Sequence, residues 1–343
     1  MKKFLIILCV VMLIGIACFA AACDTRPKVV IYTSTEDYNI EYMQKCLDEK
    51  FPEYKIIIED SLGTSEIAAK VIAEGETSDI DIVYAEEYGW LEKMISEGVL
   101  DSIAGDYDLT KYVDDAVPAS TKDYVLPAIR TGGGIVINNE VLTANGLTKP
   151  TSYADLLDPK YKGKSGKGLI SMASPASSGT GYMFYYSLVK AWGEDRALDY
   201  FAALTDNVLA YEGSGSKPVK NADSGEVAVG FGMISQAVTK ITDGNTNLEI
   251  LFFEEGAPYN LYGNAIVKGK KARPEVKAVM DYLDSFYTNA SNEKFYPEPV
   301  LKNTDYSVTN FPTSIIYSDM TGNNLTNKTA LLAKWNAMLE SKG

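Results

Sequence analysis

Two runs of small and hydroxylated residues could hold an anion. The first is Ser177-Ser178-Gly179-Thr180-Gly181, which precedes an amphipathic segment, Tyr182 to Trp192, that ends at Gly193. The free N–H groups at the start of a helix carry partial positive charge, so small residues and hydroxyls there suit an anionic oxygen cluster. Ser and Thr are also the favoured helix caps, and the run alone favours simple capping. No Walker-type lysine follows it, so nucleotide hydrolysis is not supported.

The second run is Gly213-Ser214-Gly215-Ser216-Lys217, which follows a predicted strand at Val208 to Tyr211. The hydroxyls of Ser214 and Ser216 and the single cation also suit an anionic ligand. A flexible surface turn has the same composition, so both interpretations stay open.

Two glutamates follow predicted strands in the first part of the chain. Glu36 comes after the strand Val29 to Tyr32, in a loop that also contains Thr33 and Ser34, and Glu86 follows the strand Ile80 to Tyr84. At the carboxyl end of a strand either carboxylate could face a cleft and accept hydrogen bonds from an ammonium group. A solvated loop charge is the commoner role of Glu.

Tyrosine supplies a further candidate. The sequence has 23 Tyr against 3 Trp, and Tyr259 and Tyr262 flank Asn260-Leu261 in a predicted polar-aromatic loop. Such a loop could line a pocket, and we include Tyr262 among the candidate ligand-binding residues.

Composition excludes several classes of function. The 343 residues are 46% hydrophobic and 23% charged, which is typical of a globular protein of two domains. The absence of histidine removes Ser-His-Asp and Cys-His nucleophilic sites and histidine-ligated zinc. A net charge of −14 disfavours nucleic acid as a partner.

The N-terminus indicates export. Lys2 and Lys3 precede an apolar run that ends in Ala20-Ala21-Ala22-Cys23, which predicts a signal peptide over 1–22 and resembles the lipobox of bacterial lipoproteins. Cys23 would then be the acylated first residue, with Cys18 as a weaker competitor. An uncleaved membrane anchor over 4–22 is the alternative. Both interpretations place the rest of the chain outside the cytoplasm on a membrane tether.

The remaining sequence alternates between strands and helices. Further strands are predicted at 55–59, 168–172, 227–231, 248–253 and 265–267, and helices at 38–51, 88–97, 274–287 and 328–339. This alternation predicts an α/β fold with a mostly parallel sheet covered on both faces. Cys46 is the one cysteine beyond residue 23, so we expect no internal disulfide.

The order of segments resembles that of the extracellular solute-binding lipoproteins of ABC importers, in the group related to ferric-iron, phosphonate and sugar-phosphate binding proteins. The segments that carry the resemblance are 29–32, 80–86, 97–100, 150–159, 178–182, 225–230 and 265–269. The resemblance implies a two-lobed periplasmic-binding-protein type of fold with crossing hinge strands. We assign 28–128 plus 254–310 to lobe 1, 129–253 to lobe 2 and 311–343 to a C-terminal helical segment.

The resemblance also implies binding without chemistry, so we expect no enzyme activity and no cofactor. Iron-binding members of the group hold the metal with a His, a Glu and a consecutive Tyr pair. Here Glu36 stands in place of the His, Glu86 matches the Glu, and Ser235-Gln236 stand in place of the Tyr pair. Two carboxylates without phenolates make a poor ferric site, so we expect no metal.

In members that bind phosphonates or phosphate esters, the Ser-Gly-Thr-Gly turn holds the anionic group, which favours anion binding over capping at 178–181. We therefore expect a lipid-anchored monomer that captures an aminoalkylphosphonate or a sugar phosphate for an ABC permease. The alternatives are a cationic solute, such as a polyamine or thiamine, bound by Glu36, Glu86 and tyrosines, an extracellular phosphoesterase, or a surface adhesin.

Overall fold

The computed structural model describes residues 24–304 and 306–342. The strands are β1 Lys28–Tyr32, β2 Lys55–Glu59, β3 Ile82–Glu87, β4 Leu126–Asn138, β5 Ile170–Ala173, β6 Val208–Glu212, β7 Val229–Met233, β8 Leu248–Leu251 and β9 Tyr259–Ile266. The α-helices are α2 Asp37–Lys50, α3 Thr64–Glu74, α4 Tyr88–Ser96, α5 Asn139–Asn145, α6 Gly179–Trp192, α7 Glu194–Leu204, α8 Lys217–Asp223, α9 Ile234–Thr242, α10 Pro274–Tyr282, α11 Thr288–Phe295 and α12 Leu325–Lys342. The predicted signal peptide and Cys23 lie outside the described residues.

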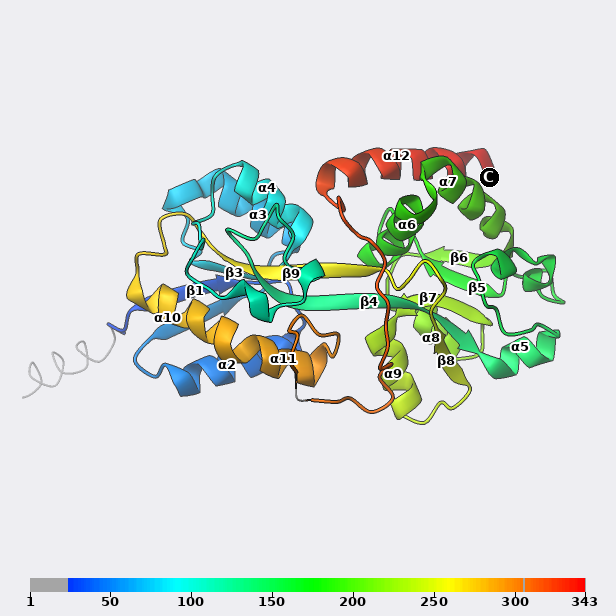
Figure 1. Ribbon diagram of the computed structural model, residues 1–343, viewed down its shortest axis with the longest axis horizontal. Coiled ribbons are helices and arrows are strands. Elements are labelled where there is room, and N and C mark those ends of the chain that lie inside the picture. The colour runs from blue at the N-terminus through cyan, green and yellow to red at the C-terminus, as the bar shows by residue number, and fades with distance from the viewer. Residues whose placement is uncertain (1–23, 305, 343) are drawn as a thin grey trace, which may run out of the picture.

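The chain folds into two α/β lobes joined by crossing strands, as predicted (Figure 1). The strand order is β2-β1-β3-β9-β4-β7-β5-β6, and β8 also pairs with β4. Within lobe 1, β1 is parallel to β2 and β3, and within lobe 2, β5 is parallel to β6 and β7. Only the long strands β4 and β9, with β8, introduce antiparallel pairs in the described sheet.

Strand β4 passes from one lobe to the other without a break. Its first half pairs with β9, from Leu126 opposite Asn264 to Gly132 opposite Tyr259, and its second half pairs with β7 and β8. The segment at 248–253 stays in lobe 2 as β8, and β9 makes the return crossing. The lobe boundaries proposed above stay a prediction.

The segment between α11 and α12 crosses the junction of the lobes, and we call residues 296–304 and 306–324 the strap (Figure 1). On lobe 1 it bridges to Tyr112 through Leu301, and beside lobe 2 it bridges to Ala257 through Tyr317. The predicted C-terminal helical segment, 311–343, is therefore helical only from Leu325. Within the described chain, no helix has both the length and the apolar character needed to span a membrane.

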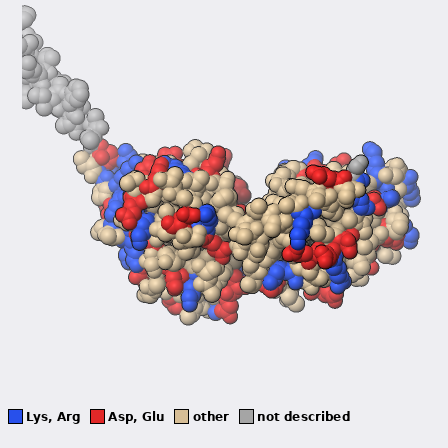
Figure 2. Space-filling view, turned by 90° about the horizontal axis from the view of Figure 1, so that it is seen from above, with Lys and Arg blue, Asp and Glu red and all other residues tan. Residues whose placement is uncertain are grey.

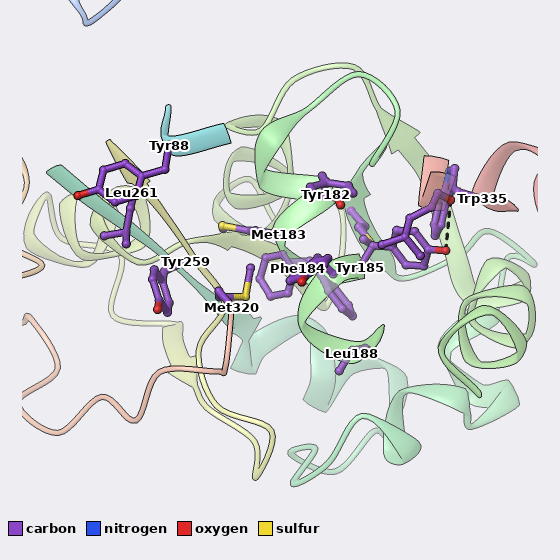
Figure 3. Close-up of a cluster of buried hydrophobic side chains, with 14 of the residues drawn as sticks. Tyr88, Tyr182, Met183, Phe184, Tyr185, Leu188, Tyr259, Leu261, Met320 and Trp335 are labelled. Atoms are coloured by element: carbon purple, nitrogen blue, oxygen red, sulfur yellow. Dashed lines mark hydrogen bonds between the residues drawn. The ribbon is translucent and has the colours of Figure 1, made fainter. Parts of the chain in front are cut away.

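Helix α12 completes the core of lobe 2. Its Trp335 is fully buried, with ring centroids 5.2 Å from Tyr185 and 5.3 Å from Phe201 (Figure 3). Burying a large apolar side chain contributes about 1.5–3 kcal/mol, so α12 is part of the fold and not an appendage. At its start, α12 also reaches lobe 1, where Lys328 Nζ lies 3.6 Å from Glu87 Oε1.

We predict that Gly181→Ala destabilises the protein. A Cβ atom at this position would lie 2.2 Å from the carbonyl oxygen of Ala173, because the start of α6 packs directly on the end of β5. Relieving such an overlap requires backbone shifts that cost about 1–3 kcal/mol. Urea unfolding measures the loss. The matched control is Gly213→Ala, because a Cβ at Gly213 meets nothing within 4 Å, and an equal effect of both substitutions would contradict the packing argument.

Candidate functional site

The first turn of α6 has hydrogen-bonding capacity that the fold does not use. The turn before it is fixed by Ser174, whose carbonyl oxygen accepts from the N–H groups of Ser177 and Ser178 at 3.2 and 2.9 Å. Ser178 is the N-cap residue, yet its side chain makes no capping hydrogen bond. The helix itself begins to bond at Tyr182, whose N–H donates to Ser178. The N–H groups of Gly179, Thr180 and Gly181 have no acceptor within the described chain and are left to another acceptor.

A second loop closes against this turn. A Cβ atom built on Gly215 would lie 2.3 Å from Thr180 Oγ1 and 3.1 Å from Ser178 Oγ, so the backbone of Gly215 faces both hydroxyls. On either side of it, Ser214 Oγ and Ser216 Oγ lie 3.1 Å apart. We call Ser178, Gly179, Thr180, Ser214, Gly215 and Ser216 the cradle. The structure thus brings both predicted runs together, whereas Ser177 is exposed at its margin.

Strand β9 connects the cradle with lobe 1. Asn260 Nδ2 lies 3.4 Å from the carbonyl oxygen of Gly179. Tyr262 is two residues further along the same strand, and alternate residues of a strand share a face. The sequence predicted a loop over 259–262, and the strand found there turns Tyr259 and Tyr262 to opposite faces. Asn260 and Tyr262 therefore lie on one face of the crossing strands, toward lobe 2 and lobe 1 respectively.

On lobe 1, Glu36 is exposed and held in place by hydroxyl groups. Glu36 Oε2 accepts from Thr35 Oγ1 at 3.1 Å and from the Tyr296 hydroxyl. The Tyr296 hydroxyl also lies 2.9 Å from Thr35 Oγ1. Burial and the neighbouring Glu36 carboxylate raise the pKa of Tyr296, so this phenol stays protonated and donates. Glu36 is therefore an oriented acceptor with one oxygen, Oε1, left for another donor.

The other predicted residues of the loop after β1 differ in exposure. Thr33 is fully buried, and its Oγ1 accepts from the N–H of Thr35 at 3.2 Å, so it shapes the loop from within. Ser34 is exposed beside it. Tyr262 is half-buried, and the carboxylates of Glu87, Glu36 and Glu86 add to burial in raising its pKa. Tyr262 and Glu36 therefore belong to the same region of lobe 1.

Glu86 does not have the predicted setting. It does not follow β3 but lies within it, opposite Gly263 of β9, and is 1% exposed. A register shift between Val83 and Glu86, where Ala85 has φ of 52°, extends the strand beyond its expected end. Burial raises the pKa of Glu86 to about 9. Glu86 is therefore protonated at neutral pH and offers no charge to an ammonium ligand, which corrects the expectation of an ionised carboxylate here.

The opposite face of the crossing strands is covered by the strap. The Arg130 guanidinium of β4 is 2% exposed, stacks on Tyr259 and Tyr317 at 4.8 and 4.3 Å from the ring centroids, and pairs with Asp115. Beside it, Glu298 of the strap accepts from the N–H of Gly132 at 2.9 Å. Burial raises the pKa of Glu298 to about 8, although Arg130 opposes the rise. This face is therefore closed by packing and hydrogen bonding.

A cavity of about 780 Å³ opens between the strap and lobe 1. Its walls include Glu87, Tyr88, Leu261, Tyr317 and Met320. Tyr259, Asn260 and Leu261 of the predicted polar-aromatic loop line it, whereas Tyr262 and the other candidate ligand-binding residues do not. Asn260 also borders the cradle. Figure 2 shows a separate hollow between the two lobes, above their narrow junction.

Sequence reasoning missed Thr35 and Tyr296. It placed Asn260 in a loop that could line a pocket, whereas the structure places it in β9. Tyr296 is 260 positions from its partner Glu36, and no local pattern links them. Gly215 had a signal, because a glycine between two serines permits the close approach that the structure shows.

Among residues 24–304 and 306–342, no group of three Cys, Asp or Glu side chains is arranged to hold a metal ion. The chemical capacity of the site is therefore that of neutral donors on lobe 2 and of one oriented carboxylate on lobe 1.

Comparisons with known proteins agree with this architecture. Residues 78–307 match the family described as bacterial extracellular solute-binding protein. An uncharacterised protein of Haemophilus influenzae is 28% identical over 275 residues, which cover 78% of this chain and 75% of that protein.

Two solved structures illustrate the similarity. The periplasmic binding protein AfuA of Actinobacillus pleuropneumoniae, solved with exogenous fructose-6-phosphate bound, is 26% identical, with a TM-score of 0.72 over 92% of this chain and 99% of that chain. Iron-bound HitA of Pseudomonas aeruginosa is 18% identical, with a TM-score of 0.74 over 91% and 99%, and at that identity supports the fold alone.

We predict that the protein loses stability as the pH rises from about 5 to about 8, because Glu86 and Glu298 keep protons in the folded state that the unfolded chain releases. Their pKa values rise from 4.5 to about 9 and about 8. The stabilisation is therefore complete below pH 4.5 and is lost as the pH passes through these raised values. Each group contributes a slope of at most about 1.4 kcal/mol per pH unit.

Urea unfolding at a series of pH values measures this slope. The sequence has no histidine, so no imidazole titrates in the same window. Glu86→Gln and Glu298→Gln should each flatten the profile, whereas Glu53→Gln, at an exposed position, should leave it unchanged. A profile of the wild-type protein that rises over this window would contradict the assignment.

Proposed function

This chain belongs to the bacterial extracellular solute-binding proteins, the ligand-capturing components of ABC transporters, and on that premise we propose that it binds a small phosphorus-containing anion between its lobes. The proposed ligand is an aminoalkylphosphonate or a sugar phosphate. The proposed site consists of the cradle with Asn260 on lobe 2 and of Glu36, Ser34 and Tyr262 on lobe 1. It acts by binding and release and not by catalysis.

The observation that carries the proposal is the unused hydrogen-bonding capacity of the cradle. Neither the Ser178 nor the Thr180 hydroxyl forms a hydrogen bond within the described chain, and Ser178 does not cap α6. Hydrogen bonds from neutral groups to a charged acceptor contribute about 1.5–3 kcal/mol each. Backbone N–H groups and hydroxyls that converge at the positive end of a helix favour a phosphate or phosphonate group.

The lobe 1 part of the site favours a ligand with hydroxyl or amine groups at its other end. Glu36 Oε1 is an oriented acceptor, and the exposed ring of Tyr38 lies close to Glu36 in the chain. The binding of fructose-6-phosphate by AfuA, a protein 26% identical to this chain, supports a phosphate ester as one such ligand. A ligand of this shape touches both lobes.

Contact with both lobes supplies the mechanism. A ligand that binds the cradle and Glu36 together favours the closed arrangement of the lobes and so distinguishes loaded from empty protein. Bending would be concentrated in β4 and β9, the strands that join the lobes. We further propose that the protein is a monomer, that Cys23 carries a lipid anchor at the outer face of the membrane, and that an ABC permease receives the ligand.

A thermal-shift screen tests the ligand class. The panel contains sugar phosphates, aminoalkylphosphonates, inorganic phosphate, polyamines, thiamine and ferric salts. A ligand at about a hundred times its dissociation constant adds roughly 2.7 kcal/mol of stability. Stabilisation by phosphorus compounds supports the proposal, and stabilisation by cations alone would refute it.

With the ligand that the screen identifies, Thr180→Val is predicted to weaken binding by about 1.5–3 kcal/mol, because one hydroxyl donor to a charged acceptor is lost. Isothermal titration calorimetry measures the change. Thr246→Val is the matched control, since Thr246 is exposed and forms no part of the cradle. Unchanged affinity of Thr180→Val would remove the cradle from the proposal.

Glu36→Gln is predicted to separate the two ligand classes. An ammonium group paired with Glu36 loses a charge-assisted hydrogen bond, so affinity for an aminoalkylphosphonate should fall at least tenfold, about 1.4 kcal/mol. Affinity for a sugar phosphate should fall less, because the Gln amide oxygen still accepts from a hydroxyl. Calorimetric titrations of the wild type and of Glu36→Gln with one ligand of each class measure the two changes in affinity. An unchanged affinity for both classes would exclude Glu36 from the site.

A further inference from the structure

The far end of lobe 2 has a cluster of lysines that form no ion pairs within the described chain. Residues 160–167, which we call the lysine loop, contain Lys160, Lys162, Lys164 and Lys167, all exposed. None of the four forms an ion pair within the chain that the structure describes. Other lysines, such as Lys149, Lys271, Lys277 and Lys334, each pair with a carboxylate. The protein as a whole has a net charge of −14.

The backbone of the lysine loop is held in place. Tyr161 is 2% exposed, and its carbonyl oxygen accepts from the N–H of Leu169 at 2.7 Å, which closes the loop. Gly163, with φ of 65°, makes the turn, and its N–H donates to Lys160 at 3.0 Å. Lys164 Nζ donates to the carbonyl oxygen of Ala144 at 2.7 Å. The lysines are therefore presented together and not on a freely moving segment.

The carboxylates near the lysine loop are engaged elsewhere. Asp158 accepts from the N–H of Lys160 at 2.9 Å, and Asp155 accepts from the N–H of Thr151 at 2.7 Å. Glu249 pairs with Lys149. These carboxylates form no ion pair with the lysine loop. Within the described chain the ammonium groups of Lys160, Lys162 and Lys167 form no hydrogen bond, so they are left to solvent or to an external anion.

The lysine loop lies at the opposite end of the long axis from the first described residues. Figure 1 shows the chain entering at the end of lobe 1, whereas α5, which Lys164 contacts, lies at the far end of lobe 2. Figure 2 shows basic side chains at that far end. A flat partner that contacted both the start of the described chain and the lysine loop would therefore extend along the whole length of the molecule.

We propose that the lysine loop binds the phosphate groups of an anionic lipid bilayer. Closely spaced lysines attract an anionic membrane surface by about 1 kcal/mol each, and the contributions add over one patch. Soluble polyanions offer the same phosphate chemistry, but this inference rests on the lipid anchor proposed above, which would hold the chain at the bilayer at a much higher effective concentration. With the tether at lobe 1 and the lysine loop at lobe 2, the long axis lies along the membrane.

The test compares binding of the full-length protein to vesicles of phosphatidylcholine alone and of equal parts phosphatidylcholine and phosphatidylglycerol. The difference in binding between the two kinds of vesicle measures the charge-dependent binding separately from insertion of the N-terminal segment. The variant replaces Lys160, Lys162, Lys164 and Lys167 with Gln. The matched control replaces Lys45, Lys122, Lys294 and Lys302, which are exposed and spread over lobe 1 and the strap, with Gln.

We expect the loop variant to bind anionic vesicles roughly 600-fold more weakly than the wild type, since each of the four lysines contributes about fivefold. The control variant should keep most of it, and added salt should weaken the wild type toward the loop variant. Equal losses in both variants would show a general charge effect and overturn the proposal. Loss of vesicle binding on adding inorganic phosphate at a fixed ionic strength would assign the loop to free phosphate and would also overturn it.

Discussion

The antiparallel pairing of β4 with β9 is the constraint on which the other features depend. Two lobes that are assembled from distant parts of the sequence meet through this pair, from Leu126 opposite Asn264 to Gly132 opposite Tyr259. Because side chains alternate along a strand, the pair has two different faces. One is sealed by Arg130, Tyr317 and Glu298, and the other presents Asn260 and Tyr262 to the lobes. The β4–β9 pair thus has one face that is packed against the strap and one face that is accessible from between the lobes.

The charge distribution explains how an acidic protein can bind an anion. At a net charge of −14 the long-range field repels anions, and the cradle contains no Lys or Arg. Its donors are backbone N–H groups and hydroxyls, which act only at hydrogen-bonding distance. Nearby carboxyls such as Glu86 are protonated, which removes repulsion close to the crossing strands. Recognition by neutral donors favours ligands that fit the cradle over anions in general.

The sequence was informative wherever a local pattern set the structure. The strand-helix alternation follows from hydrophobic periodicity, and the helix predicted over Tyr182 to Trp192 is present as α6, which begins three residues earlier, at Gly179. Glu86 shows the limit, because its burial depends on a register shift that pairs β3 with a strand more than 170 residues away. The contact between Glu36 and Tyr296 was equally invisible, since it needs the strap to return to lobe 1. Local periodicity contains no information on such distant pairings.

The position of α12 has a consequence for the order in which the chain can fold. Trp335 fills the core of lobe 2 between Tyr185, Phe201 and Tyr211, although the rest of that lobe ends near Leu251. Lobe 1 similarly needs β9, α10 and α11, which follow all of lobe 2 in the chain. During synthesis from the N-terminus, lobe 1 cannot bury its full core until α11 has emerged, and lobe 2 cannot do so until α12 has emerged. A nascent chain of this kind stays incompletely folded until its final residues are made, the state in which a polypeptide can still be threaded through a narrow export channel.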